Sequence, residues 1–300
     1  MVDALRAFVD EASDEALAGI SPLEFAATHG LDEKSTIDAF VHAARLGLFD
    51  MAWNICCPGC GGVLDAGTQL KAFVKNEYPC AMCSASYEPT LDELVAVTFS
   101  VSPSLRKIAS HNPNRLSFWE FYRQTYFGPG MALPTGKEWE GLIRSFTLEE
   151  EVLAPGERVV LSLRLPAEFL ILFEPVTHSA TFFDVKGDET RDRQDLVVVF
   201  SESGAHHDTI QLRPGPLRLT LENKTDRRLL PGLFRANDQL HTMMRRRRSV
   251  LTATRLLSNH VFRTLYKTPH AGCRPAPEDR QPHGIVHRSE GVVGALRAGG

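Results

Sequence analysis

Hydrophobic residues recur at helical spacing between residues 21 and 50, the first strongly patterned region of the chain. Ser21-Pro22 is a start signal for one helix, Gly30 is a stop signal, and Asp32 can cap a second helix. The apolar positions of the second helix form one stripe, which contains Ile37, Phe40, Val41, Ala44 and Leu48. We therefore predict two helices joined by a turn, typical of a small winged-helix-like unit over residues 1–50.

Short runs with β-type patterning lie between residues 146 and 230. Turn residues such as Pro155-Gly156 and Pro214-Gly215-Pro216 separate them. The runs are Arg158–Leu165, Phe169–Phe173, Ala180–Val185, Asp195–Ser201, Thr209–Leu212 and Leu217–Glu222. This spacing predicts an antiparallel β-sandwich. His206-His207 lies in one of the turns, and we interpret it as a solvated loop because two adjacent histidines do not easily face one metal ion.

The remaining segments complete an α+β multidomain chain. Leu94–Val101 alternates like a strand. We interpret residues 101–145 as a helical connector, in which the aromatic stretch Phe118–Phe127 predicts a core helix. Residues 231–267 return to helical patterning and predict linker helices, over too few heptads to indicate a coiled coil. Residues 268–300 contain no aromatic residue and no sustained period, which predicts a disordered tail.

Composition narrows the class of protein. The chain has 300 residues with 43% hydrophobic and 23% charged residues, which is enough for several cores. A formal net charge of -4 argues against bulk attraction to nucleic acid, and residues 32–50 hold four acidic residues against two basic ones. Basic residues are concentrated at Arg245–Arg248. This run is typical of a solvated helix face, and a contact with an acidic partner or a phosphate is the alternative. No apolar run is long enough to predict a membrane span.

Two CxxC pairs carry the most specific chemistry in the sequence. Cys57-Pro-Gly-Cys60 and Cys80-Ala-Met-Cys83 are separated by a segment of a length typical of four-thiolate zinc sites, so we predict a zinc-ribbon module over residues 51–100. Four thiolates leave no coordination position for water or substrate, which indicates a structural zinc ion. We interpret the adjacent Cys56 as a buried small hydrophobic residue. Reduced thiolates also favour a cytoplasmic compartment.

Several segments resemble a known group of proteins. These segments are Ser21-Pro-Leu-Glu-Phe-Ala-Ala, Leu31-Asp-Glu-Lys, Trp53-Asn-Ile-Cys-Cys-Pro-Gly-Cys-Gly-Gly, Tyr87-Glu-Pro-Thr-Leu-Asp and Leu229-Leu-Pro-Gly. They are similar to the uncharacterised region that precedes the catalytic domain in a group of bacterial class III adenylate/guanylate cyclases. The resemblance spans residues 21–267. It implies a non-catalytic sensory or regulatory region whose last helices relay orientation to an output domain.

The tail does not resemble a cyclase domain in the given reading frame. Residues 270–300, back-translated and read one base later, permit a sequence that is similar to the opening of a class III cyclase domain. We therefore expect a frameshift near Thr268, and a chain that is not an enzyme as given because none of the metal-binding carboxylates of that domain is in frame.

Other readings and partners remain open from the sequence. The alternative function is a free-standing zinc-ribbon and winged-helix adaptor that binds protein or nucleic acid through Arg245–Arg248. The predicted sandwich offers a surface for a protein or small-molecule signal, and the C-terminal helices offer a homodimer contact. Neither a membrane nor nucleic acid is an expected partner.

Overall fold

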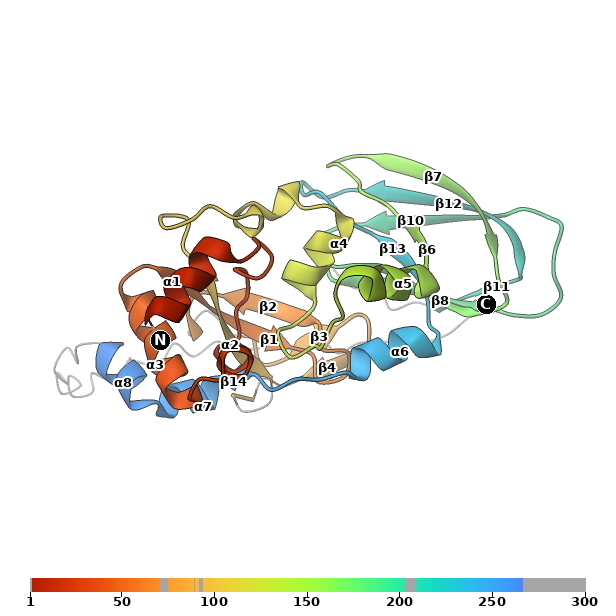
Figure 1. Ribbon diagram of the computed structural model, residues 1–300. Helices are drawn as coiled ribbons and strands as arrows, with labels where there is room; N and C mark the ends of the chain where they lie inside the picture. The colour runs from red at the N-terminus through yellow and green to blue at the C-terminus, as the bar shows by residue number, and fades with distance from the viewer. Residues whose placement is uncertain (1, 71–74, 89, 92–93, 203–208, 267–300) are drawn as a thin grey trace, which may run out of the picture. The chain divides into compact units, whose positions relative to one another are not determined.

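The helices and strands of the computed structural model are distributed unevenly along the chain (Figure 1). The structure describes residues 2–70, 75–88, 90–91, 94–202 and 209–266. The α-helices are α1 (Val2–Glu11), α2 (Pro22–His29), α3 (Glu33–Arg45), α4 (Phe118–Phe121), α5 (Gly136–Phe146), α6 (Asp238–Arg245), α7 (Ala253–Ser258) and α8 (His260–Leu265). Shorter helical turns are Ala109–His111, Pro113–Arg115 and the π-helical turn Tyr122–Tyr126.

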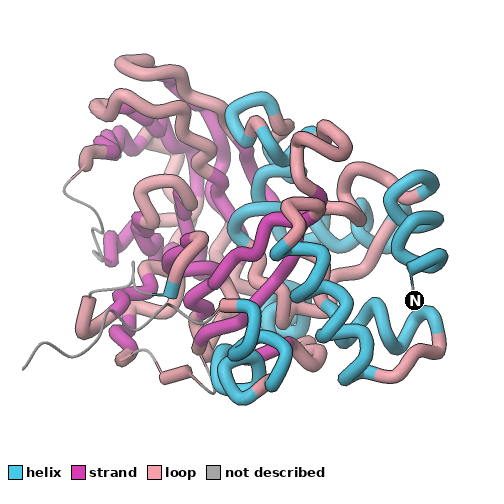
Figure 2. Tube along the Cα trace, turned by 90° about the vertical axis from the view of Figure 1, so that its left-hand side faces the viewer, coloured by secondary structure: helices cyan, strands magenta, loops and turns pink. Residues whose placement is uncertain are grey.

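The strands in the described part of the chain form four sheets. They are β1 (Phe49–Cys56), β2 (Val63–Gly67), β3 (Tyr78–Cys80), β4 (Ala85–Tyr87), β5 (Val95–Val101), β6 (Thr147–Glu150), β7 (Arg158–Leu165), β8 (Phe169–Glu174), β9 (Ser179–Val185), β10 (Gln194–Phe200), β11 (Thr209–Leu212), β12 (Gly215–Asn223), β13 (Gly232–Arg235) and β14 (Leu251–Thr252). Their orders are β14-β5-β1-β2, β10-β12-β7, β11-β9-β8-β13-β6 and β3-β4. In Figure 2 most strands gather on one side of the described region and many of the helices on the other. The predicted α+β class is therefore confirmed.

The two N-terminal helices begin and end where their capping residues predict. Ser21 Oγ accepts a hydrogen bond from Glu24 N at 3.4 Å and caps α2. Gly30 ends α2 with a φ of 62°, a left-handed conformation that glycine adopts without strain. Asp32 Oδ1 accepts from Ser35 N at 2.8 Å and caps α3. The helix–turn–helix prediction is confirmed.

One hydrophobic core joins the two ends of the described chain. It contains buried residues from α2 and α3, from β1 and β5, and from α7 and α8, among them Phe40, Phe99, Leu256 and Phe262. Strand β1 (Phe49–Cys56) runs across the expected boundary between residues 50 and 51. The N-terminal helices therefore do not form a core of their own, but share one with the first sheet and the last helices.

The six predicted β-runs correspond to strands β7 to β12. Two sheets face each other across a core of leucine, phenylalanine and valine side chains, including Leu172 and Phe183 from the five-stranded sheet and Leu219 and Leu221 from the three-stranded sheet. Alternating burial along β7 and β10 reflects one face on this core and one on solvent. The predicted sandwich of two packed sheets is present.

The prediction of a purely antiparallel sandwich is wrong for two strand pairs. Strand β10 pairs with β12 in parallel, and β11 pairs with β9 in parallel. From β9 to β12 the chain passes to the opposite sheet after every strand. The chain reverses its direction at each crossing. Strands β9 and β11 therefore run in the same direction in one sheet, and β10 and β12 do so in the other.

The segment after residue 231 is not wholly helical, which corrects the linker-helix prediction. It first forms β13, which pairs with β8 and β6 inside the five-stranded sheet. Leu233 and Phe234 are both buried, because the two faces of this central strand are covered by different clusters. The chain then forms α6, an extended segment, β14, and the short helices α7 and α8. Asn259 separates α7 from α8 and caps α8 by accepting from Phe262 N at 2.9 Å.

The aromatic stretch in the connector forms a core helix, as predicted. Helix α4 continues into the π-helical turn Tyr122–Tyr126, and both pack against the five-stranded sheet, α5 and α6. The Tyr122 hydroxyl lies within hydrogen-bonding distance of Phe173 O, at 3.1 Å, and Leu230 O, at 3.0 Å. These contacts attach the aromatic turn to β8 and to the segment before β13, and the last residues of the turn lie beside the cysteine pairs.

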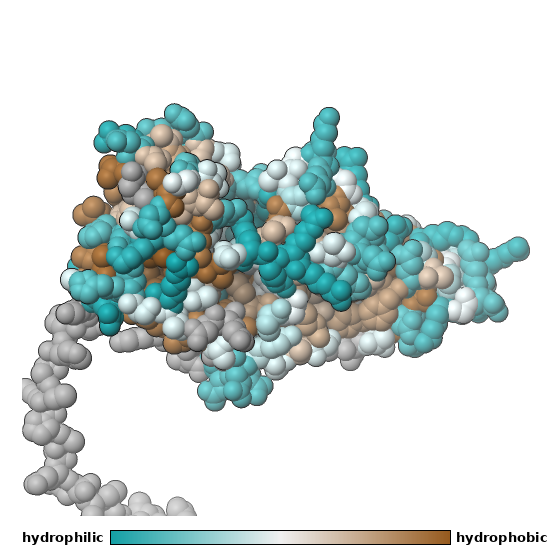
Figure 3. All heavy atoms as spheres, turned by 60° about the horizontal axis from the view of Figure 1, so that its bottom comes forward, coloured by the Kyte–Doolittle hydropathy of each residue, from teal (hydrophilic) through white to brown (hydrophobic). Residues whose placement is uncertain are grey.

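The surface is mixed in character. Hydrophilic side chains cover much of the face shown in Figure 3, with smaller hydrophobic areas among them. Within the described residues, no helix combines the length and the apolar composition that crossing a membrane requires. The predicted tail, residues 268–300, and the His206-His207 pair lie outside the described residues.

Candidate metal centre

The first cysteine pair lies in the turn between β1 and β2, which we call the first cysteine turn (residues 57–62). Gly61 N donates to Cys57 O at 2.8 Å, and Cys60 N lies 3.5 Å from Cys57 Sγ. Gly61 has a φ of 80°, which a glycine adopts readily. The turn therefore brings the sulfurs of Cys57 and Cys60 to the same side and directs the backbone amide of Cys60 towards the sulfur of Cys57.

The second cysteine pair lies in the turn between β3 and β4, the second cysteine turn (residues 80–84). Ser84 N donates to Ala81 O at 3.3 Å, and Ser84 has a φ of 49°. Ser84 occupies the position after the second cysteine, as Gly61 does in the first turn. The two turns thus share a left-handed residue at the same place, which is a glycine in the first turn and a serine in the second.

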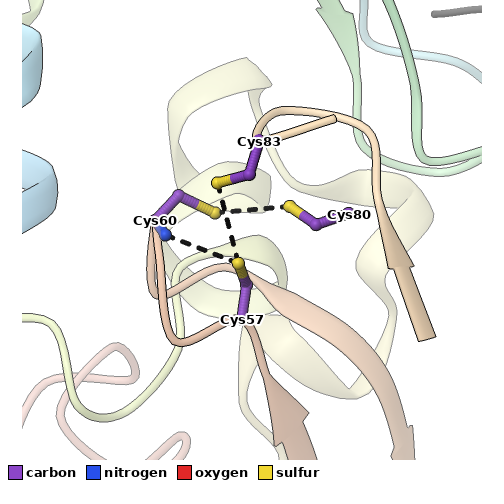
Figure 4. A group of neighbouring side chains, drawn as sticks. All are labelled: Cys57, Cys60, Cys80 and Cys83. Carbon is purple, nitrogen blue, oxygen red and sulfur yellow. Dashed lines mark hydrogen bonds between the residues drawn. The ribbon is translucent and has the colours of Figure 1, made fainter. Parts of the chain in front are cut away.

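The structure brings all four predicted cysteines together (Figure 4). The sulfurs of Cys57, Cys60, Cys80 and Cys83 lie within 4.8 Å of one another. Cys57 Sγ is 3.7 Å from Cys83 Sγ, and Cys60 Sγ is 3.6 Å from Cys80 Sγ. A tetrahedral site with zinc–sulfur bonds of about 2.3 Å has sulfur–sulfur edges of about 3.8 Å. Two of the six sulfur–sulfur distances match such an edge, and the four side chains lie close enough together to hold one metal ion.

The electrostatics of four neighbouring thiols favour a bound cation. Hydrogen bonding with Cys60, Cys80 and Cys83 lowers the pKa of Cys57, while hydrogen bonding with Cys57 raises the pKa of Cys80. Four thiolates this close together would repel one another in a site that is largely buried. A divalent cation removes that repulsion, because it lets all four sulfurs lose their protons and act as ligands.

Side chains and glycines outside the four cysteines fix the shape of the site. Tyr126 is buried, and its Oη lies 3.8 Å from Cys60 Sγ. Burial raises the pKa of Tyr126 well above its usual value. A Cβ added to Gly59 would lie 3.0 Å from Cys83 Sγ and 3.1 Å from Tyr87 Oη. Sequence reasoning placed Tyr126 only in a core helix, because its contact with the sulfurs depends on how the π-helical turn packs.

Cys56 is separate from the metal cluster. Its thiol donates to Asn54 O at 3.7 Å, and burial raises its pKa to about 12. A thiol with so high a pKa stays protonated at neutral pH and is a poor nucleophile and a poor ligand. Cys56 was interpreted as a buried small hydrophobic residue, and the structure shows its side chain as only partly buried.

The Arg245–Arg248 run begins at the end of α6 and continues into an extended segment rather than along one helix face. Arg246 pairs with Glu138 at 3.4 Å, Arg247 donates to Gly59 O at 2.9 Å, and Arg248 pairs with Glu24. Three of the four arginines therefore bind groups of the same chain.

A small, mostly apolar pocket of about 20 Å³ lies beside the metal centre. Cys60, Trp119, Tyr126, Phe234 and Met243 are among the residues that line it. This volume holds about one water molecule, so the space admits no substrate.

Comparison with protein families matches residues 1–264 to a family of unknown function, DUF5939. No curated protein and no solved structure matches the chain. The matched residues include both cysteine turns, the sandwich and nearly all of α8. Since the match covers most of the 300 residues, the chain belongs to the family of unknown function DUF5939.

Proposed function

We propose that residues 1–266 are a non-catalytic regulatory region that precedes the catalytic domain of a class III adenylate/guanylate cyclase. The observation that carries the proposal is the packing of α7 and α8 into the core of the N-terminal helices. Ala253 and Leu256 are fully buried there, and Phe262 is nearly so. A change in that core would therefore move the point at which the chain leaves the region, which is what a relay to an output domain requires.

Polar contacts reinforce the position of these last helices. Arg255 pairs with Glu33 at 2.6 Å, and Asn259 Nδ2 donates to Asp38 Oδ1 at 2.7 Å. Both partners lie on α3, which lies beside α7 and α8 in Figure 1. Because the buried faces of α7 and α8 are used within the chain, a homodimer contact through these helices would use their outer faces.

The metal ion in this proposal is a structural zinc in a zinc-ribbon-like pair of cysteine turns, adjoining a winged-helix-like unit. Four cysteine sulfurs suit zinc, and they fill its tetrahedral coordination without leaving a place for water. The ion would then stabilise the region rather than perform chemistry. A site built from reduced thiolates also supports a cytoplasmic location.

Assays of cyclic-nucleotide synthesis test this function. The chain, incubated with ATP or GTP and Mg²⁺ or Mn²⁺, should give no cyclic nucleotide above the blank. A gene from which one base is removed near the Thr268 codon should encode a protein that makes cyclic nucleotide. Synthesis by the given chain that is lost on mutation within residues 1–266 would refute the proposal, as would a corrected gene that meets an early stop codon.

The alternative adaptor function has less support from the geometry. Binding of nucleic acid through Arg245–Arg248 would require Arg246, Arg247 and Arg248 to leave their partners in the chain. We expect no binding to random duplex DNA at micromolar protein and physiological salt, measured by fluorescence anisotropy, because few phosphates can be neutralised. Binding with a steep salt dependence would favour the adaptor instead.

A further inference from the structure

An extended segment between α6 and β14, which we call the strap (residues 246–250), lies along a second extended segment, the glycine segment (residues 127–132). Ala132 N donates to Arg246 O at 3.1 Å, and Arg248 N donates to Gly130 O at 2.9 Å. Met131 and Arg247 are paired as a β-bridge between these two bonds. The strap is thus hydrogen-bonded as if it were a short strand.

The other side of the glycine segment contacts the first cysteine turn. Gly128 N donates to Gly61 O at 3.0 Å, and Phe127 forms a β-bridge with Gly62. A Cβ on Gly128 would clash with Gly61 O, so only glycine permits this close approach. The cysteine turn, the glycine segment and the strap therefore follow one another in a hydrogen-bonded series.

Arg247 also connects the strap to the cysteine turn directly. Its Nη2 donates to Gly59 O at 2.9 Å, and its Nη1 donates to Met244 O. A Cβ added to Gly61 would lie 3.0 Å from Arg247 Nη1, which shows how closely the guanidinium covers the turn. A divalent ion held by four thiolates leaves the centre negatively charged, so a fixed cation beside it is stabilising.

The strap leads directly to the last helices. Leu251 in β14 pairs with Val97 of β5, and α7 begins at Ala253. Leu251 and Ala253 are both fully buried in the core that α7 and α8 share with the N-terminal helices. Displacement of the strap would therefore also displace the start of α7.

We propose that Arg247 is a positioning residue that couples metal binding to docking of the strap and of α7–α8. The inference rests on the proposed metal centre and adds a regulatory role to it. Coupling between two sites is reciprocal: the metal ion favours the docked strap, and the docked strap raises metal affinity by the same factor. The metal centre would thus set the stability of the helices that leave the region.

Zinc affinity, measured by competition with a chromogenic chelator, tests the coupling. Arg247→Gln should weaken zinc binding by about 10-fold to 100-fold, the range for partners just outside a metal's ligands. Arg246→Gln is the matched control, because Arg246 is the neighbouring strap residue and its side chain pairs with Glu138 on α5. Its zinc affinity should stay within about threefold of the wild type. Equal affinities for the two variants would overturn the proposal.

Hydrogen exchange measured by mass spectrometry gives a second test. The protein keeps its zinc throughout, so the result does not depend on a chelator that could unfold it. Peptides covering residues 251–266 should exchange faster in Arg247→Gln than in the wild type or in Arg246→Gln. Unchanged exchange in these peptides would overturn the coupling even if zinc affinity fell. A wild-type protein that binds no zinc would instead refute the metal centre itself, so the two failures are distinguishable.

Discussion

Replacing Cys80 with serine is expected to remove the bound metal and most of the folded protein. Cys80 is fully buried at the end of β3, and its sulfur lies 3.6 Å from that of Cys60. A serine hydroxyl does not ionise at neutral pH, so only three thiolates would remain. Structural zinc sites contribute about 10 kcal/mol or more of binding free energy to folding, and a lost ligand forfeits much of it. Metal analysis should fall from about one ion per chain to nearly none.

Cys56→Ser is the matched control for this experiment. Cys56 directly precedes the first pair but donates to Asn54 O instead of facing the other sulfurs. This variant should keep about one metal ion per chain and a melting temperature close to that of the wild type. A folded Cys80→Ser protein that retains a full equivalent of metal would show that the four cysteines are not the ligand set.

Local signals in the sequence were sufficient where the physical cause was itself local. Ser21 and Asp32 cap their helices through bonds to residues three positions away, and Gly30 supplies a left-handed residue next to the helix it ends. The CxxC pairs are similar, because each turn brings its own two sulfurs together. Only the meeting of the two turns needed the fold, and the spacing between them predicted it.

Features that depend on distant packing were missed. The parallel pairing of β10 with β12 follows from the order in which the chain visits two sheets, which alternation along one strand does not encode. Strand β13 is too short to show the alternation of apolar and polar residues that is typical of a strand, and its apolar residues are equally compatible with a helix. The arginine run resembled a solvated face because its partners, such as Gly59 and Glu24, are more than 180 positions away in the sequence.

Replacing Glu174 with alanine is expected to lower the free energy of unfolding by about 3–5 kcal/mol, the cost of leaving buried hydrogen-bonding groups without a partner. Glu174 is completely buried at the end of β8. Its carboxylate accepts from Val176 N at 3.0 Å, Thr177 N at 2.6 Å, Thr177 Oγ1 at 2.7 Å and Leu230 N at 3.1 Å. It therefore holds the turn after β8 against the segment that enters β13. Burial raises its pKa, although these hydrogen bonds partly offset that effect.

Glu168→Ala is the matched control, because Glu168 is a partly exposed carboxylate that pairs with Arg235 at 3.4 Å near the other end of β8. Such a pair contributes about 0–1 kcal/mol, so this variant should unfold at nearly the wild-type denaturant concentration. Glu174→Gln keeps the shape of the side chain but turns an amide NH₂ towards two donors, and it should fall between the other two variants. Urea unfolding followed by circular dichroism gives all three values. If Glu174→Ala were no less stable than Glu168→Ala, the buried carboxylate would not be what holds the turn after β8 against the segment that enters β13, and the backbone pairing of β8 with β13, together with the contacts of the Tyr122 hydroxyl with Phe173 O and Leu230 O, would be sufficient there.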